Sequence, residues 1–366
     1  MNKAHSKKSN NTWIMITVAV FVLTTIMLCV FAFRLYLNGF KEVADSNTYD
    51  QYYVMIAENR KSSFWQSVYQ GAYERGLEEN VYVDLLGENL SQDYSREDLM
   101  KIALSSGVDG IIVAADESEE MTELINAAAA QEIPVVTLYG DNTHSNRCSF
   151  VGVGSYNLGR EYGRQVLKLA EESNFNTIYT VQKGEDGMVM RAEEKQMINV
   201  AVLVNAYAHD SGQNILCSGI QDAIVQEKTG EREIALSLIS IDNTNSFSVE
   251  ESIRDIFMEE ELPDIIVCLN ELNTTCVYQA VVDYNKVGEI AILGYYDSDT
   301  IINAIDRNVI NATISIDTNQ MGSFCIDALT EYYEYGNTSQ YFTADVTLID
   351  KSNVSAYLEG GEEDEN

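Results

Sequence analysis

Short apolar runs alternate along most of the chain with longer segments in which apolar residues recur every three or four positions. Such runs are typical of buried strands and such segments of amphipathic helices, so the alternation predicts a parallel sheet flanked by helices. The expected strands are 52–57, 81–86, 109–113, 133–138, 148–153, 199–204, 233–241, 264–269, 289–293, 312–316 and 342–349. Helices are expected between most successive strands, and the first should open at Ser62 or Ser63 and end near Glu79.

Residues 174–198 do not follow this rhythm. Thr177 to Val181 has the pattern of a strand, Lys183 to Gly187 of a turn, and Met188 to Ile198 of a second strand or a short helix. Two registers are therefore open, in which the next strand of the main sheet is either 177–181 or 199–204. The later strand is favoured because the elements after it then follow at normal spacing, which makes 174–198 an insertion.

The amino-terminal part carries an apolar segment of membrane-spanning length. Residues 13–33 are uncharged, and at about 1.5 Å per residue a helix of this length crosses the hydrocarbon core of a bilayer. The lysines of residues 1–12 predict a cytoplasmic amino terminus, with the rest of the chain outside the cell. A signal peptide cleaved after Val30-Phe31-Ala32 is the alternative, but we expect an uncleaved single-pass anchor followed by a stalk at 34–50.

The acidic composition narrows the classes of partner. The chain has 366 residues, enough for two ordinary domains, and a formal net charge of -34. A surface this acidic repels nucleic acid, which is therefore not an expected partner. The end of the chain, 359–366, reads as a solvated acidic tail.

Neither the cysteines nor the histidines are spaced for catalysis or metal binding. The six cysteines lack CxxC spacing and nearby histidines, which argues against a zinc site or a disulfide framework. Cys268 and Cys276 suit buried small apolar positions. His5, His144 and His209 have no partner at a catalytic spacing, and no glycine-rich phosphate loop occurs. We therefore expect no enzyme, no metal and no cofactor.

An unusual aromatic pair, Phe64 and Trp65, follows the first strand. In an open parallel sheet the carboxyl ends of the strands form the edge where ligands bind, and this pair opens a helix at that edge. Two adjacent side chains on a helix are not expected both to point inward, so at least one ring is expected to face a ligand. Packing of both rings beneath a loop is the alternative.

The order of these elements and several short stretches resemble the type I periplasmic binding proteins, in particular the ribose/galactose-binding family. The effector domains of lactose-repressor-type transcription factors share that fold, and the resemblance covers about residues 51–355. Its markers are Phe64-Trp65 with Gly71-Ala72, Gly107 to Val113, Ile133 to Leu138, Asn157-Leu158-Gly159, Leu293 to Asp297, Ala312 to Ile314 and Gln320 to Gly322.

The resemblance implies an α/β fold of two doubly wound parallel-sheet lobes, preceded here by the transmembrane helix. Three crossovers join the lobes as a hinge, and closure would hold a ligand in the cleft between them. Chain order gives residues 51–154 plus 317–343 to the first lobe, and residues 155–316 plus 344–358 to the second.

The resemblance also implies which residues face the cleft. The matching positions are Ser62, Phe64, Trp65, Tyr139, Asp141, Asn214, Ser246 or Phe247, Asn270, Asp297 and Asp317. Tyr139 and Gly140 stand where many sugar binders have an Asp-Arg pair, and Asp141 follows one residue later. This sequence therefore departs from a simple pentose or hexose binder.

Two alternatives remain among these positions. Arg191 replaces Asn214 as the cleft residue if the strand is 177–181 instead of 199–204. Asn270 and Asp297 each precede a helix, so either could serve only as a helix cap. As a set on one sheet edge, amides, carboxylates and aromatic rings suit a hydroxyl-rich ligand.

Together these observations predict a membrane-anchored extracytoplasmic solute-binding protein. Its ligand would be a small polar molecule, a sugar or a sugar derivative, which it would pass to an ABC transporter. The alternative is a sensory subunit whose closure signals to a membrane histidine kinase. A repressor is the weakest option, because an apolar span stands where a DNA-binding headpiece would be.

Overall fold

The computed structural model describes Met27 and residues 49–90, 92, 94–172, 177–184, 187–194, 197–206, 211–230 and 232–358. Within these residues no helix is both long and apolar enough to cross a membrane. The predicted anchor at 13–33 lies outside the described residues except for Met27, as do the predicted cytoplasmic segment, most of the stalk and the acidic tail. Gln51 begins one compact unit that holds both sheets.

The first sheet is parallel throughout and has the strand order β13-β5-β4-β3-β1-β2. Its strands are β1 (Gln51–Ile56), β2 (Val81–Leu85), β3 (Gly110–Val113), β4 (Val135–Leu138), β5 (Ser149–Gly152) and β13 (Tyr341–Thr343). The helices of this lobe are α2 (Ser63–Glu78), α3 (Arg96–Ser106), α4 (Glu119–Ala130) and α10 (Thr318–Tyr335). All four residues of β3 and of β4 are buried, as expected for central strands of a parallel sheet covered on both faces.

The second sheet repeats this topology with the order β14-β12-β11-β10-β8-β9, and only β14 is antiparallel to its neighbour. Its strands are β8 (Met197–Asn205), β9 (Glu233–Ile241), β10 (Ile265–Cys268), β11 (Ala291–Tyr295), β12 (Ala312–Ile316) and β14 (Val346–Asp350). The helices of this lobe are α5 (Ser155–Glu171), α6 (Ser211–Glu227), α7 (Ser246–Met258), α8 (Glu271–Asp283), α9 (Asp299–Asp306) and α11 (Ser355–Leu358). The prediction of two α/β lobes with parallel sheets is therefore confirmed.

The chain passes between the lobes three times: after β5, after β12 and after β13. The three crossing segments are hydrogen-bonded to one another. Ala344 N–H donates to the carbonyl of Gly152 at 2.9 Å, and Asp317 N–H donates to that of Asp345 at 3.0 Å. The third crossing thus lies beside the other two, and together they form one hinge strip.

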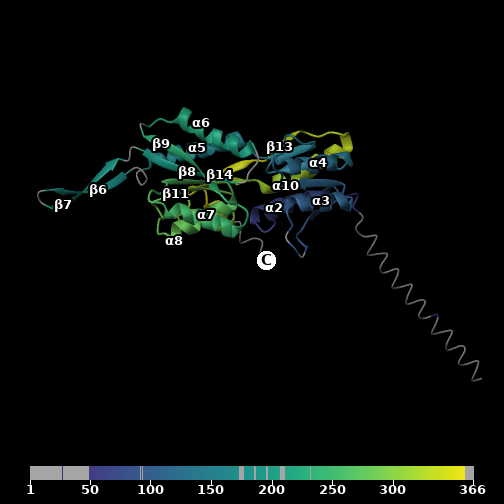
Figure 1. Cartoon of the computed structure of the whole chain (residues 1–366), viewed down its shortest axis with the longest axis horizontal. Coiled ribbons are helices and arrows are strands. Elements are labelled where there is room, and N and C mark those ends of the chain that lie inside the picture. The colour runs from purple at the N-terminus through teal and green to yellow at the C-terminus, as the bar shows by residue number, and fades with distance from the viewer. Residues whose placement is uncertain are drawn as a thin grey trace, which may run out of the picture. The chain divides into compact units, whose positions relative to one another are not determined.

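A separate antiparallel hairpin, β6 (Thr177–Gly184) and β7 (Gly187–Glu194), precedes β8. It pairs with neither main sheet and extends away from the second lobe (Figure 1). Because β8 is the sheet strand, the register that places an insertion at 174–198 is confirmed, and the one that uses 177–181 as a sheet strand is wrong.

Two helix pairs pack at unusually short range because glycine stands at the crossing point. A Cβ added to Gly322 of α10 would lie 2.1 Å from the carbonyl oxygen of Val68 in α2, and one at Gly159 of α5 would lie 2.0 Å from that of Leu216 in α6. Any side chain at these positions would force the helices apart. The α2–α10 contact fixes the helix that carries Phe64 and Trp65.

The five cysteines in the described part of the chain are free thiols, and Cys268 and Cys276 are buried as predicted. Burial raises the pKa of Cys148 to about 12 and that of Cys276 to about 11, so little thiolate is present at neutral pH. At about pH 8 we expect iodoacetamide to label Cys148 and Cys276 of the native protein less than about a tenth as fast as in urea-unfolded protein. Peptide mass spectrometry measures the labelling, and equal rates in the two states would contradict the burial.

Candidate functional site

The carboxyl ends of the strands in the two sheets meet at the boundary between the lobes. Tyr139, directly after β4, donates its hydroxyl proton to the carbonyl of Leu269, directly after β10, at 3.3 Å. Parallel strands place the residues that follow them at one edge, so this bond brings the two edges together. The candidate site lies here, where a ligand would contact both lobes.

The helix α2 begins at this boundary. Ser62 is its N-cap, as predicted, and accepts a hydrogen bond from Trp65 N–H at 3.3 Å. Phe64 and Trp65 are each only 4% exposed, with ring centroids 5.3 Å apart and an edge-to-face angle of 88°. The expectation that both rings could not point inward is wrong. It assumed one core beneath the helix, whereas the first turn of α2 is covered by residues of both lobes.

Five rings from both lobes form an interlobe aromatic cluster: Phe64, Trp65, Tyr139, Tyr295 and Tyr296. The first three belong to the first lobe, and both Trp65 and Phe64 lie edge-on to Tyr139, with centroids 5.7 and 5.5 Å apart. Phe64 also reaches Tyr296 at 5.3 Å, and Tyr139 reaches Tyr295 at 6.3 Å. Edge-to-face pairs of this kind contribute about 0.5–1.5 kcal/mol each beyond area burial.

Tyr139 and Tyr296 occupy equivalent places in the two sheets and share a rare backbone conformation. Their φ angles are 68° and 74°, in the left-handed region that non-glycine residues seldom adopt. Each N–H donates at 2.9 Å to the next strand, Tyr139 to Val151 and Tyr296 to Ile314. Such strain costs about 1–3 kcal/mol per residue and is concentrated at functional sites.

Polar contacts close the boundary around the cluster. Glu271, in the first turn of α8, accepts hydrogen bonds from the Ser63 hydroxyl and, at 3.3 Å, from Phe64 N–H. Tyr296 donates its hydroxyl proton to the Ser63 carbonyl at 3.4 Å. A carboxylate at the amino end of α2 is also favoured by the helix dipole. These contacts form a latch between α8 of the second lobe and α2 of the first.

A second latch joins the lobes at another point of the same boundary. The Ser211 hydroxyl, at the start of α6, donates to the Glu117 carboxylate at 3.2 Å. Glu117 follows β3 in the first lobe and also accepts from Thr143 at 3.1 Å. Carboxylates of both lobes thus serve as acceptors across the boundary.

Three predicted polar residues stand one or two positions after strands of the second sheet. Asn270 and Asp317 are the N-caps of α8 and α10, so each uses its side chain in the capping role considered from the sequence. Asp297 is different because the N-cap of α9 is Ser298. Asp297 accepts from the Ser315 hydroxyl at 2.7 Å, and burial raises the pKa of its carboxyl, with the charge of Asp317 acting in the same direction.

Asp141 is held in a network inside the first lobe. It forms a bidentate ion pair with Arg147, with Nη2 2.7 Å from Oδ2, and it accepts from Thr137 at 2.8 Å and from Asn142 N–H at 2.7 Å. The guanidinium of Arg147 also lies 5.2 Å from the centre of the Tyr341 ring. An Asp-Arg pair does occur near this corner, but it is formed from residues that are not adjacent in sequence.

The remaining predicted residues lie apart from the aromatic cluster. Asn214 is exposed on the first turn of α6, and Phe247 is 63% exposed on the first turn of α7. Arg191, the alternative to Asn214, is in β7, where its backbone pairs with Thr180 in the separate hairpin. No ring contact or hydrogen bond described for Asn214 or Phe247 reaches the cluster.

Tyr295, Tyr296 and Glu271 are the site residues that sequence reasoning missed. Tyr295 and Tyr296 belong to the stretch Leu293 to Asp297, where only the aspartate was selected. The signal in the sequence was a second pair of adjacent aromatic residues, like Phe64 and Trp65, near the carboxyl end of a predicted strand. Glu271 carried none, because its partner Ser63 is 208 residues away in sequence.

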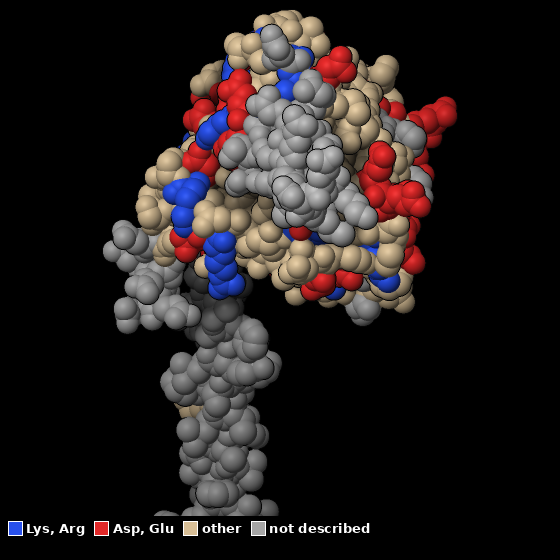
Figure 2. Space-filling model, turned by 90° about the vertical axis from the view of Figure 1, so that its left-hand side faces the viewer, with Lys and Arg blue, Asp and Glu red and all other residues tan. Residues whose placement is uncertain are grey.

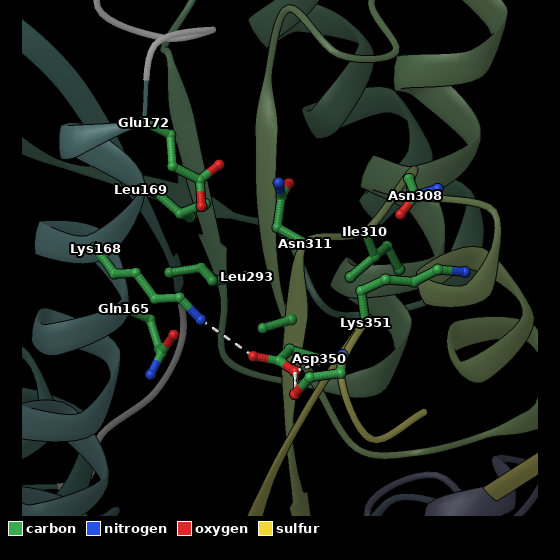
Figure 3. A pocket seen from close by; sticks show the side chains of 12 residues that line it. Gln165, Lys168, Leu169, Glu172, Leu293, Asn308, Ile310, Asn311, Asp350 and Lys351 are labelled. Atoms are coloured by element: carbon green, nitrogen blue, oxygen red, sulfur yellow. Dashed lines mark hydrogen bonds and ion pairs between the residues drawn. The ribbon is translucent and has the colours of Figure 1, made fainter. Parts of the chain in front are cut away.

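A cavity of about 350 Å³ lies elsewhere in the second lobe, between the end of α5 and the start of β11 and β12 (Figure 3). Lys168 and Asp350 form an ion pair of 3.1 Å at its wall, and Asn311 accepts from Ile292 N–H at 3.0 Å. These positions are at the amino ends of β11 and β12, opposite the edge that carries the aromatic cluster. Among the described residues, no group of histidine, cysteine and acidic side chains is arranged to hold a metal ion.

Solved structures of other proteins have a similar fold. GanP, a glucose-galactose binding protein from Geobacillus stearothermophilus, is similar, with 20% identity over 83% of this chain and 98% of its own, and a TM-score of 0.68. XylFII in a complex with LytSN has 22% identity over 83% of this chain and 98% of its own, with a TM-score of 0.64. A solute binding protein from Actinobacillus succinogenes with bound D-allose has 16% identity over 84% and 100%, with a TM-score of 0.66. At these identities the likeness shows the fold alone.

No protein of curated function matches the chain. The family described as a periplasmic binding protein domain matches residues 53–337, well over half of the sequence. The two parallel-sheet lobes and the three crossings agree with that match. The chain belongs to the periplasmic binding protein family, and its fold is of type I.

Proposed function

We propose that the chain captures a small polar, carbohydrate-like ligand at the boundary between its lobes. The observation that carries the proposal is the interlobe aromatic cluster, which is built from both lobes where the carboxyl ends of the strands meet. Flat apolar rings beside Asn270, Asp297 and Asp317 suit the apolar faces and hydroxyl groups of a sugar. The type I fold, shared with GanP and with the D-allose complex, supports the same ligand class.

Ligand entry would require the lobes to separate. Phe64 touches Tyr295 and Tyr296, and the Glu271 latch joins α8 to α2, so a ligand reaches the rings only after these contacts part. The three crossings are short and lie side by side, which suits rotation about one hinge strip. Closing on a ligand would place it between the rings of the two lobes, and the second latch, Ser211 with Glu117, could form again.

The proposal predicts a specific effect of Asp297→Asn. An ionised Asp297 accepts hydrogen bonds from sugar hydroxyls more strongly than an amide, so the affinity for the ligand should fall roughly 10- to 100-fold.

The same substitution should change how stability depends on pH. Burial raises the pKa of the Asp297 carboxyl, so the folded state holds the proton more firmly than the unfolded state. Stability due to this group is then lost as pH rises from the ordinary carboxyl range through the raised pKa, and the Asp297→Asn substitution should remove that loss.

A thermal-shift screen of the full chain against sugars, polyols and nucleosides tests the proposal, with isothermal titration of any compound that stabilises it. Asp255→Asn, on the exposed face of α7, removes the same charge far from the cluster and is the matched control. No stabilisation by any compound would refute the ligand class. Stabilisation that Asp297→Asn leaves unchanged would remove Asp297 from the site.

We also propose that residues 13–33 anchor the chain with the lobes on the extracytoplasmic side. The support is the apolar run with its basic flank and the family of the lobes. Carbonate extraction of membranes, combined with protease access to intact spheroplasts, tests both points. Release by carbonate, or protection of the lobes from protease, would contradict the anchor or the orientation.

Delivery to an ABC transporter is the role we favour after capture, and a sensory role with a membrane histidine kinase is the second candidate. The observation that favours the second is that XylFII, a similar structure, is known in a complex with LytSN. Deletion of the gene distinguishes delivery to a transporter from sensing. Loss of uptake of the identified ligand supports delivery, whereas intact uptake with lost transcriptional induction by that ligand supports sensing.

A further inference from the structure

The outermost strand of the second sheet, β9, has an open edge of unusual length. It is nine residues long and pairs on one side only, with β8. After Glu233 it contains no charged residue, although 22% of the chain is charged. Leu238, in its middle, is 56% exposed. A long, apolar, uncharged edge is a template for pairing with another strand.

The backbone groups that face outward can be identified. The Ile241 carbonyl accepts from Ala206 N–H on the β8 side. Because successive residues of a strand direct their N–H and C=O groups to opposite sides, those of Ile234, Leu236, Leu238 and Ser240 point away from β8. No hydrogen bond to these groups is described within the part of the chain that the structure covers.

The other three edges of the two six-stranded sheets are shorter or blunted. β2 has five residues, including Asp84, and the carbonyl of Val83 already accepts from the Tyr69 hydroxyl. β13 has three residues, and β14 has five and ends in Asp350, which is paired with Lys168. Charges and short length are the usual means of preventing edge pairing. Neither feature is present in β9 after Glu233, which distinguishes it from the other edges of the two six-stranded sheets.

We propose that β9 is the contact surface between two copies of this chain, joined as an antiparallel pair about a two-fold axis at Ser237. In this register Leu236 faces Leu238 of the second copy, and Ile234 faces Ser240 of the second copy. Each of these pairs uses outward N–H and C=O groups, so each exchanges two hydrogen bonds. The two sheets become one continuous sheet across the axis.

The lack of charge along β9 allows a second copy to pair at this register without local repulsion. Each chain carries a formal charge of -34, so two copies repel one another except where acidic residues are absent. Figure 2 shows Asp and Glu side chains on both sides of the face at the left of Figure 1, with Lys and Arg side chains among them. On β9 the one acidic residue, Glu233, faces Ile241 of the second copy. No like charges meet along the paired strands, and added salt should strengthen the pair.

The axis gives a direct test by cross-linking. Ser237 would face Ser237 of the second copy as a non-hydrogen-bonded pair, with Cα atoms about 4.5 Å apart, which is within disulfide range. We expect Ser237→Cys in the full chain, in its own membranes, to form a cross-linked dimer on mild oxidation. Ser240→Cys is the matched control, since Ser240 is also exposed on β9 but faces Ile234 of the second copy. Cross-linking at Ser237 that is no stronger than at Ser240 would overturn the proposal.

A second measurement does not depend on the new thiol. Purified full-length chain should sediment as a dimer, and Leu238→Glu, which places a carboxylate against Leu236 of the second copy, should weaken the dimer at least about tenfold. Val282→Glu adds the same charge at an exposed site on α8 and should leave the dimer intact. A monomeric wild-type chain, or equal effects of the two variants, would refute the β9 contact.

Discussion

Gly322→Ala is expected to destabilise the folded chain by at least about 1–3 kcal/mol, the usual cost of overpacking. The added Cβ would lie 2.1 Å from the Val68 carbonyl oxygen and 2.4 Å from the Ala72 nitrogen. Both atoms belong to the backbone of α2, so no side-chain rotation can relieve the clash, and α10 must move away from α2. Urea unfolding followed by far-UV circular dichroism measures the loss.

The matched control is Gly230→Ala, where an added Cβ meets no atom within 4 Å. That substitution should leave stability unchanged or raise it slightly, because it restricts the unfolded chain. Equal midpoints for Gly322→Ala and Gly230→Ala would contradict the tight α2–α10 contact. Since α2 carries Phe64 and Trp65, the Gly322 variant should also lose ligand-induced stabilisation.

The alternation of buried strands and helices was predictable because it follows from local patterns, whereas the division into two lobes was implied by the family resemblance. β3 and β4 are short apolar runs that the structure buries completely, and Ser62, Ser95 and Ser118 each cap a helix where serine precedes an apolar-periodic segment. Strand carboxyl ends share one edge in any parallel sheet. The edge at which the cluster forms was therefore predictable before any contact was known.

The contacts across the lobe boundary could not be predicted in the same way. Ser63 with Glu271, and Phe64 with Tyr296, join segments more than two hundred residues apart, and their meeting depends on how two independently folded sheets face each other. The burial of both Phe64 and Trp65 has the same origin. Helix periodicity assumes one apolar neighbour on one side, and it cannot represent a helix end enclosed between two lobes.

The hairpin β6–β7 illustrates a different limit. Its alternating sequence correctly suggested strands near Thr177 to Val181, but a strand pattern does not say which sheet a strand joins. Spacing to the later elements decided the register in favour of β8. The ion pair of Asp141 and Arg147 could not be predicted for another reason. The two residues are close in sequence, but no local sequence pattern marks them as partners.

Trp65→Ala is expected to destabilise the folded chain strongly. The ring is 4% exposed and packs edge-on against Phe64 and Tyr139, so truncation should cost about 3–5 kcal/mol of folding free energy. Urea unfolding measures this loss. Tyr335→Ala, which removes an aromatic ring that is 64% exposed at the end of α10, should cost far less and serves as the control.

Trp65→Phe then distinguishes a ligand platform from a purely structural ring. A phenyl ring keeps the edge-to-face contact with Tyr139 and much of the buried apolar area, so most of the stability should return. If the indole face also stacks on the ligand, the Phe variant should still bind several-fold more weakly than wild type, because its stacking area is smaller. Ligand titrations of both proteins, at a temperature where each is fully folded, measure that difference. Equal affinities with restored stability would assign Trp65 to the interlobe packing alone and leave recognition to the tyrosines opposite it.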